Sequence, residues 1–520
     1  MKKERIREFI IIFICGIVSL VVLAYYVRDR IHKEIDEGVY EEEVEICPTI
    51  EFTNGAKIKA FESTEDTVVF PLPLGFEMSK LTFEDGRKFS AEESGAFTEE
   101  SLTEIMGRPC EILSGGNVPI AFVDMDADSV EIMADTKQQT FTGRYEIYDH
   151  EDKLYSGLVD DMGTRGHSSF DTVKPGYKFN ITTPEDFFGM GKDNHYIFLP
   201  AYRDTCFLSY VVYHEIADAI EYDDTPEQTP IHLVINGQYL GLFILSERVE
   251  IEKERFDYDT SRNGKNGECS FLIELENREY KDETYPFYPY FMTYRDERYA
   301  IRYPRQATTE ESDFVKSYLD RAEKCLWDGG TDEYGMTKWD YFDLDSNVNQ
   351  YLIFQFGSEL SLSASVYYSY DAAGDGSIHA IRPWDVEHSF GAKRIEISAE
   401  KQFDKYYMPF TFRRFVYDEE FQKEAAKAWF DRIVPVLNAS VEADSKSYIP
   451  SNDEDEKIPG YVPGGLSGMN FYLAKYHDAM ELDSRLYEFE LGYEEKADVI
   501  RTYLTDRQKY LSDYYSEYVK

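Results

Sequence analysis

Alternating apolar and polar positions predict several β-strands in the first half of the chain. A period of two is the pattern of a strand with one buried face. The clearest stretches are residues 118–123, 141–148 and 153–159. Two further apolar runs, Ile231–Ile235 and Tyr239–Leu245, flank Asn236-Gly237. Because Asn-Gly readily adopts the positive φ angles of a tight turn, we expect these two runs to form a hairpin.

Apolar positions spaced three and four residues apart predict helices, most of them in the second half. Phe314, Tyr318, Ala322 and Cys325 form one such stripe, which is the spacing of a helix with one buried face. The other predicted helices span residues 207–220, 348–359, 421–437 and 494–515. Strands and helices mixed in this way indicate an α+β fold.

The N-terminal segment has the pattern of a membrane anchor. A bilayer crossing needs about 20 apolar residues, and the run Phe9–Val27 contains no charged residue. Basic residues before the run predict a cytoplasmic N-terminus and a main domain outside the membrane. A cleaved signal peptide is the alternative, but no small-residue cleavage motif follows the run. These basic residues are Lys2, Lys3, Arg5 and Arg7.

Composition shifts divide the chain into segments. We expect a basic tail at 1–8, a transmembrane anchor at 9–27, a charged stalk at 28–46, a small β-rich module of unassigned role at 47–114, and a main domain at 115–515. Five cysteines lie beyond the anchor without metal-ligand spacing, so we expect at most one disulfide and mainly buried thiols.

The charge balance excludes one class of partner. With 55 basic and 100 acidic residues, the formal net charge is −45. Nucleic-acid binding requires clustered Lys and Arg to neutralise phosphates, so we expect no nucleic-acid partner. The acidity favours solubility, and it would also attract basic protein substrates or divalent cations.

A basic cluster in the first half could bind phosphate. Arg165-Gly166 is followed by Ser168, Lys174 and Lys178. Glycine lets backbone N–H groups approach an anion closely, and Arg and Lys supply charge for phosphate oxygens. On a strand covering 177–181, Lys178 would face away from the core. A basic edge strand on an acidic protein would give the same pattern.

An acidic cluster in the second half could bind a metal ion. Asp385 and Glu387 follow Trp384, and an extended strand would place both carboxylates on one face. Paired carboxylates of this kind can hold Mg²⁺ against nucleotide phosphates. His388 is adjacent, but a structural histidine is the more common case. The zinc-protease pattern that begins at His214-Glu215 lacks its second histidine.

Several motifs, in the same order, resemble those of the CotH kinase family, the family of spore coat protein H. Arg165–Phe170 with Lys174 and Tyr177-Lys178 resembles the opening motif, Arg-Gly-Asn-Ser-Ser/Thr-Trp followed by Lys-Lys-Pro-Tyr-Lys-Ile-Lys. Leu233–Glu247 is similar to the Asn-Gly-x-Tyr-x-Gly-x-Tyr-x-Leu-x-Glu stretch, and Pro383–Gly391 to Pro-x-Trp-Asp-x-Asp. The resemblance runs from about Val118 to Leu511.

The resemblance implies an atypical protein kinase fold, ATP, Mg²⁺ or Mn²⁺, and transfer of phosphate to protein Ser or Thr. It makes Asp385 and Lys178 the catalytic candidates and Asp385 and Glu387 the metal ligands. The nucleotide-binding candidates are Arg165, Gly166, Ser168, Lys174, Lys178 and Glu247. We expect the substrate to be a secreted or surface protein, Ser-rich and basic.

Some departures from the family motifs fall on residues that carry chemistry. The last lysine of the opening motif is replaced by Asn180, and the stretch Glu359–Ser365 has no Asp. One lost phosphate contact can cost a factor of about 10²–10³ in rate. The alternative hypothesis is therefore a catalytically degenerate pseudokinase that serves as a surface binding or assembly protein.

Overall fold

The computed structural model describes most of the chain from residue 47 to residue 520. The ranges not described are 1–46, 127–131, 134–138, 167–171, 203, 221, 223–225, 252–257, 259–266, 277–288, 358–363, 382–383, 385, 391–409, 439–468, 488 and 490. The predicted tail, anchor and stalk therefore lie outside the described residues.

The central feature is a sheet that closes on itself. Strands follow the order β12-β11-β10-β9-β8-β13-β14, and β12 also pairs with β14, so seven strands form a closed ring. All neighbours are antiparallel except β8 and β13, which are parallel. The strands are β8 (Ile120–Met125), β9 (Phe141–Asp149), β10 (Asp152–Arg165), β11 (Gly176–Glu185), β12 (Asp193–Leu199), β13 (Gln228–Ile235) and β14 (Gln238–Glu247).

Aromatic side chains fill the inside of this ring. Phe179 packs 5.0 Å from Phe198, and Phe187 packs 4.7 Å from Tyr196, measured between ring centroids. All four side chains are buried in one apolar cluster. The alternation that predicted the strands thus follows from one face of each strand lining this core.

The predicted Asn-Gly hairpin is confirmed. Asn236 and Gly237 have φ angles of 50° and 80° and join β13 to β14. The Asn236 side-chain oxygen also accepts the backbone N–H of Met125 at 2.6 Å. The turn therefore fixes the hairpin register and ties it to the neighbouring strand β8.

N-terminal strands extend the same sheet. β2 pairs with β14 in parallel, and β1, β5 and β6 continue outward from it. These strands are β1 (Thr49–Phe52), β2 (Lys57–Lys59), β5 (Met78–Thr82) and β6 (Lys88–Ser90). Beside them lie the helices α2 (Ala91–Ser94) and α3 (Glu99–Met106) and the three-stranded sheet β3 (Phe61–Glu62), β4 (Val68–Leu72) and β7 (Cys110–Ser114).

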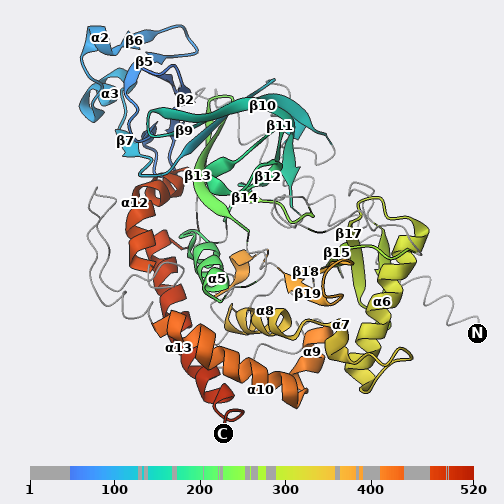
Figure 1. Cartoon of the computed structure of the whole chain (residues 1–520). Coiled ribbons are helices and arrows are strands. Elements are labelled where there is room, and N and C mark those ends of the chain that lie inside the picture. The colour runs from blue at the N-terminus through green and yellow to red at the C-terminus, as the bar shows by residue number, and fades with distance from the viewer. Residues whose placement is uncertain are drawn as a thin grey trace, which may run out of the picture.

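The other half of the molecule combines a second sheet with helices (Figure 1). Its strands, in spatial order, are β16 (Tyr290–Met292), β17 (Arg298–Tyr303), β15 (Phe271–Glu276), β18 (Ala364–Tyr370) and β19 (Ile378–Ile381). Its helices are α5 (Leu208–Ala219), α6 (Thr309–Asp328), α7 (Lys338–Tyr341), α8 (Leu344–Gly357), α9 (Phe410–Val416) and α10 (Glu419–Ala428), which continues as a π-helical turn over Trp429–Ile433. The predicted helices around 207–220, 314–325, 348–359 and 421–437 are thus confirmed in kind, with shifted ends.

Two C-terminal helices connect the halves. α12 (Met469–Leu486) packs against β14 and β7, whereas α13 (Tyr493–Tyr515) packs against α5, α8 and α10. Figure 1 shows them running along one side of the molecule, from the closed sheet to the helical half. The C-terminal segment of the chain therefore packs against both the closed sheet and the central helices.

The predicted fold class is wrong. We expected an α+β, atypical kinase-like domain with a small N-terminal β-rich module and a transmembrane helix. The structure instead has a closed seven-stranded ring together with helices, and none of the described helices could span a membrane. A period of two identifies a strand and its buried face, but it does not say which edges pair. The closure between β12 and β14 was therefore not readable from the pattern.

The predicted membrane anchor is also corrected. Its residues, 9–27, lie outside the described residues, and within the described ranges no helix has the length and apolar composition needed to span a bilayer. The single-pass anchor, and the location outside the membrane that depended on it, are not supported.

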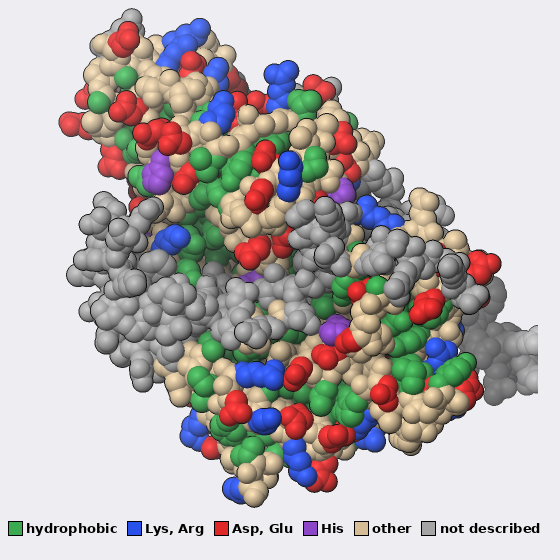
Figure 2. All heavy atoms as spheres, viewed as in Figure 1, with side chains coloured by type: hydrophobic (Ala, Val, Ile, Leu, Met, Phe, Trp, Pro, Cys, Tyr) green, Lys and Arg blue, Asp and Glu red, His purple; other side chains and the backbone are tan. Residues whose placement is uncertain are grey.

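The described cysteines agree with the expectation of mainly buried thiols. Cys47, Cys110, Cys206, Cys269 and Cys325 are all buried free thiols. Figure 2 shows acidic and basic side chains interspersed over both halves of the visible face, with the described basic residues scattered rather than gathered.

Candidate functional site

The predicted basic cluster lies where β10 ends and β11 begins. Arg165 is the last residue of β10 and pairs with Gly176, the first residue of β11. Along β11, Tyr177, Phe179 and Ile181 are buried inside the ring. Side chains alternate along a strand, so Lys178 faces outward, as predicted. Ser168 lies outside the described residues.

The early and late motifs meet through Arg165 and Trp384. The guanidinium carbon of Arg165 lies 5.7 Å from the centre of the Trp384 ring, within the range of a cation–π contact. The same ring packs edge-on against Tyr367 of β18. The end of β10 is therefore in contact with the segment that carries the predicted metal ligands.

The acidic cluster is only partly described. Asp385 lies outside the described residues, whereas Glu387 is buried in a short 3₁₀ turn, Val386–His388. The expectation of an extended strand at Asp385–Glu387 is therefore wrong at Glu387, because a 3₁₀ turn does not place residues two apart on one face. Glu387 remains a buried carboxylate close in sequence to Trp384.

Lys174 makes all its contacts inside the protein. Its Nζ donates to both carboxylate oxygens of Asp483, each at 2.8 Å, and to the carbonyl oxygen of Leu242 at 2.7 Å. A lysine ammonium has three donors, so these bonds use all of them. Burial lowers the pKa of Lys174 and raises the pKa of Asp483, while their mutual attraction opposes both shifts.

The surroundings of this pair are built to fit it. Leu242 N–H donates to Asp483 Oδ1 at 2.8 Å. Gly241 has a φ of 95°, and a Cβ there would lie 2.1 Å from the same oxygen. The glycine in the motif between Asn236 and Glu247 is therefore required by the approach of α12.

Lys178 lies in a more open place. Its Nζ is 2.9 Å from Asp161 Oδ1, and the two side chains are 24% and 32% exposed. Asp161 belongs to β10, so the pair bridges neighbouring strands. Lys178 is held near the Arg165 end of the sheet while its side chain stays accessible.

Glu247 is the last residue of β14 and is buried. Its Oε2 accepts the backbone N–H of Glu227 at 2.9 Å. This bond fixes the carboxylate at the end of the hairpin. The role of Glu247 as a nucleotide-binding residue stays a prediction.

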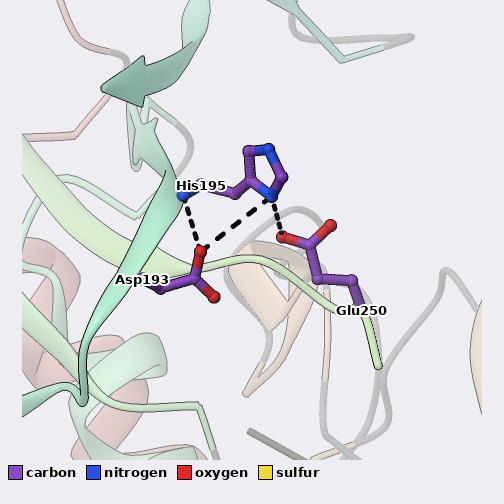
Figure 3. A group of neighbouring side chains, drawn as sticks. All are labelled: Asp193, His195 and Glu250. Atoms are coloured by element: carbon purple, nitrogen blue, oxygen red, sulfur yellow. Dashed lines mark hydrogen bonds and ion pairs between the residues drawn. The ribbon is translucent and has the colours of Figure 1, made fainter. Parts of the chain in front are cut away.

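The structure adds a cluster that sequence reasoning missed, formed by Asp193, His195 and Glu250 (Figure 3). His195 Nδ1 lies 2.9 Å from Glu250 Oε1 and 3.9 Å from Asp193 Oδ1. Asp193 and His195 are two residues apart on β12, and this spacing on a strand could have indicated a pair of ligands on one face. Glu250 lies more than fifty residues later in the chain, and no spacing rule connects it to them.

Arginines balance part of the negative charge of Glu250. Glu250 also forms an ion pair with Arg305 through its other oxygen, Oε2. Burial alone would raise the pKa of Glu250, but the His195 hydrogen bond and the charges of Arg248, His195 and Arg305 outweigh it and lower the pKa to about 2. Glu250 is therefore ionised at neutral pH.

A second, more exposed group with metal-ligand chemistry lies beside β19. His379 Nε2 is 3.0 Å from Asp375 Oδ2, and His379 Nδ1 is 3.8 Å from Asp343 Oδ1. Asp375 is exposed to solvent. This group provides a comparison for the Asp193, His195 and Glu250 cluster.

The fold and the site define a two-part protein in which a closed sheet meets the half that contains the second sheet and most of the helices. We call the contact formed by Arg165, Trp384 and Tyr367 the seam between these two parts. The model of the family described as CotH kinase protein matches residues 162–511. The chain therefore belongs to the CotH kinase family. A search of curated proteins found no match.

Proposed function

We propose that this protein is an ATP-dependent kinase that uses Mg²⁺ or Mn²⁺ to transfer phosphate to Ser or Thr of a protein substrate. The observation that carries the proposal is the contact between Arg165 and Trp384. It brings the end of the basic motif to the segment that contains Asp385 and Glu387. Phosphoryl transfer depends mainly on positioning of the reactants and on neutralisation of phosphate charge. The basic motif and the carboxylate segment would together supply these two effects.

The residues present fit a divalent cation. Glu387 is a buried carboxylate three residues after Trp384 in the chain, and carboxylate oxygens are the ligands that Mg²⁺ and Mn²⁺ prefer. With Asp385 it would hold the ion, which supplies charge neutralisation on the nucleotide phosphates. Arg165 and Lys178 would bind phosphate oxygens, the Gly166 backbone and Ser168 would contact the phosphates, and Glu247 would orient a lysine.

In the proposed reaction the substrate hydroxyl oxygen attacks the γ-phosphorus and the bond to the β–γ bridging oxygen breaks. ADP leaves, and the hydroxyl proton passes to water. We expect the substrate to be basic, because the chain carries a net charge of −45, and Ser-rich, because the proposed transfer is to Ser or Thr.

A second candidate is a pseudokinase that binds partners without phosphorylating them. Two observations favour it. Lys174 uses all three donors within the chain, and Asn180 stands where the family motif has a lysine. Both remove positive charge that phosphate binding would use.

Transfer of labelled γ-phosphate to a Ser-rich basic protein, with Mg²⁺ or Mn²⁺, tests the first candidate. We expect Asp385→Ala to abolish transfer and Lys178→Ala to reduce it by a factor of about 10²–10³, as for a lost transition-state contact. Lys153→Ala is the matched control, because Lys153 also pairs with a carboxylate on this sheet, Glu146 at 2.6 Å, away from Arg165.

The same assay separates the two candidates. A thermal unfolding measurement with ATP and metal complements it, since a ligand at 100 times its Kd stabilises a protein by about 2.7 kcal/mol. Stabilisation without any phosphate transfer would favour the pseudokinase over the kinase. Transfer that survives Asp385→Ala would contradict the proposed role of that residue.

A further inference from the structure

We propose that Asp193, His195 and Glu250 form a binding site for a transition-metal dication such as Mn²⁺ or Zn²⁺. The site is distinct from the Asp385 and Glu387 carboxylates and does not depend on the proposed kinase activity. Its ligands come from two segments, β12 and the chain that follows β14.

The distances suit a metal ion. Metal–ligand bonds of about 2.0–2.2 Å place neighbouring ligand atoms roughly 3.0–3.5 Å apart in octahedral or tetrahedral geometry. His195 Nδ1 is 2.9 Å from Glu250 Oε1 and 3.9 Å from Asp193 Oδ1. Figure 3 shows the Nδ1 edge of the imidazole turned toward both carboxylates, with the other ring nitrogen pointing away. Only small movements would bring all three atoms to one ion.

The ligands are held in place before any ion binds. Backbone N–H groups of Asn194 and His195 donate to Asp193 Oδ1. Arg305 pairs with Glu250 Oε2, so ligation through Oε1 would leave that ion pair intact. Asp193 and Glu250 are each only 6% exposed. Preorganised and partly dehydrated ligands are what a specific metal site requires.

Asn180 supplies an independent indication of a ligand. It pairs directly with His195 across β11 and β12, so the two side chains lie on the same face of the sheet. Its Oδ1 is buried and has no hydrogen-bond partner among the described residues. Buried polar atoms are normally satisfied, and an amide oxygen beside His195 could serve as a further oxygen ligand.

The donor set indicates the class of metal. One imidazole nitrogen with carboxylate oxygens suits Mn²⁺, Fe²⁺ and Zn²⁺, whereas Mg²⁺ prefers oxygen ligands alone and keeps several waters. The chemistry therefore separates this site from the oxygen-only pair Asp385 and Glu387.

The position of the site gives the ion a structural consequence. Val249 and Ile251, on either side of Glu250, pack in one apolar cluster with Tyr367, Ile381 and Trp384. An ion held by Glu250 and His195 would fasten this segment to β12. It would thereby stabilise the seam in which Arg165 contacts Trp384.

The test uses the full chain and Mn²⁺ as the probe, in excess Mg²⁺ so that oxygen-only sites are filled. Electron paramagnetic resonance measures bound Mn²⁺, and pulsed measurements detect ¹⁴N coupling from a histidine ligand. We expect one bound Mn²⁺ with ¹⁴N coupling in the wild type. His195→Gln should remove the coupling and weaken binding at least tenfold, and Asp193→Asn should weaken binding at least tenfold.

Two variants make the outcome specific. His379→Gln alters the more exposed group and should leave the signal unchanged, and Glu387→Gln should do the same even if it abolishes phosphate transfer. The proposal fails if the wild type shows no ¹⁴N coupling, if the coupling persists in folded His195→Gln, or if His379→Gln removes it. Far-ultraviolet circular dichroism establishes that each variant is folded.

Discussion

Lys174 and Lys178 are four residues apart in one motif, yet they occupy contrasting regions of the molecule. Lys174 is 1% exposed and bound on all three donors at the junction of α12 with β14. Lys178 is 24% exposed and pairs with Asp161 on the outside of the ring. The first region is dry and closed, and the second is open to solvent.

The difference teaches that a shared motif does not imply a shared role. A buried ion pair is costly to break, because the remaining charge is stranded away from water. A partly exposed pair contributes little, because solvent screens it and rehydrates either partner. We infer that Lys174 serves stability and that Lys178 remains accessible to a ligand.

The largest expected effect is that of Lys174→Met. It leaves Asp483 buried without its cation and should lower the free energy of unfolding by about 3–5 kcal/mol, measured by urea denaturation. The double variant Lys174→Met/Asp483→Leu should recover most of this loss, because no charge stays stranded. A loss below about 1 kcal/mol for the single variant would show that the junction is not the dry region described above.

The next effect concerns His232, which pairs with Leu242 across β13 and β14 and so borders the same junction. Its Nε2–H donates to the Gly115 carbonyl at 2.7 Å, and its Nδ1 accepts from the Tyr239 hydroxyl at 2.8 Å. Burial lowers the pKa of His232 to about 4, against the opposing effect of the Gly115 hydrogen bond and with a further decrease from Lys174.

Since the pKa of His232 is lower in the folded state than the usual 6.5, its contribution is fully present above pH 6.5. It is lost as pH falls toward 4. We expect this histidine to account for a loss on the order of 3 kcal/mol over that interval. Unfolding free energies measured between pH 7 and pH 4 should fall less steeply in His232→Gln than in the wild type. Equal slopes would contradict the assignment, and the exposed His477→Gln serves as control.

The smallest expected effect on stability is that of Lys178→Met. Loss of its pair with Asp161 should change the unfolding free energy by less than about 1 kcal/mol, measured as for Lys174→Met. A loss as large as that of Lys174→Met would remove the contrast between the two regions. A small loss of stability combined with a large loss of phosphate transfer would sharpen it.

Local patterns predicted much of the secondary structure. The hairpin at Asn236-Gly237, the buried alternation along β11 and the helix over 309–328 all follow from short-range chemistry. The candidate site was less readable. The contact of Arg165 with Trp384 joins residues more than two hundred positions apart. The cluster around His195 includes Glu250, which lies in the segment after β14.

The sequence by itself determined the positions of most elements, the order of the family motifs and the buried state of the cysteines. Turn geometry, side-chain alternation and helical spacing operate over a few residues and leave a direct trace in the chain. Only the tertiary structure decided that β12 and β14 close the ring. It also decided that Asp483 forms an ion pair with Lys174 and that Glu250 lies within ion-pair distance of His195. Burial and partner choice depend on packing between distant segments, and no local pattern records which segments meet.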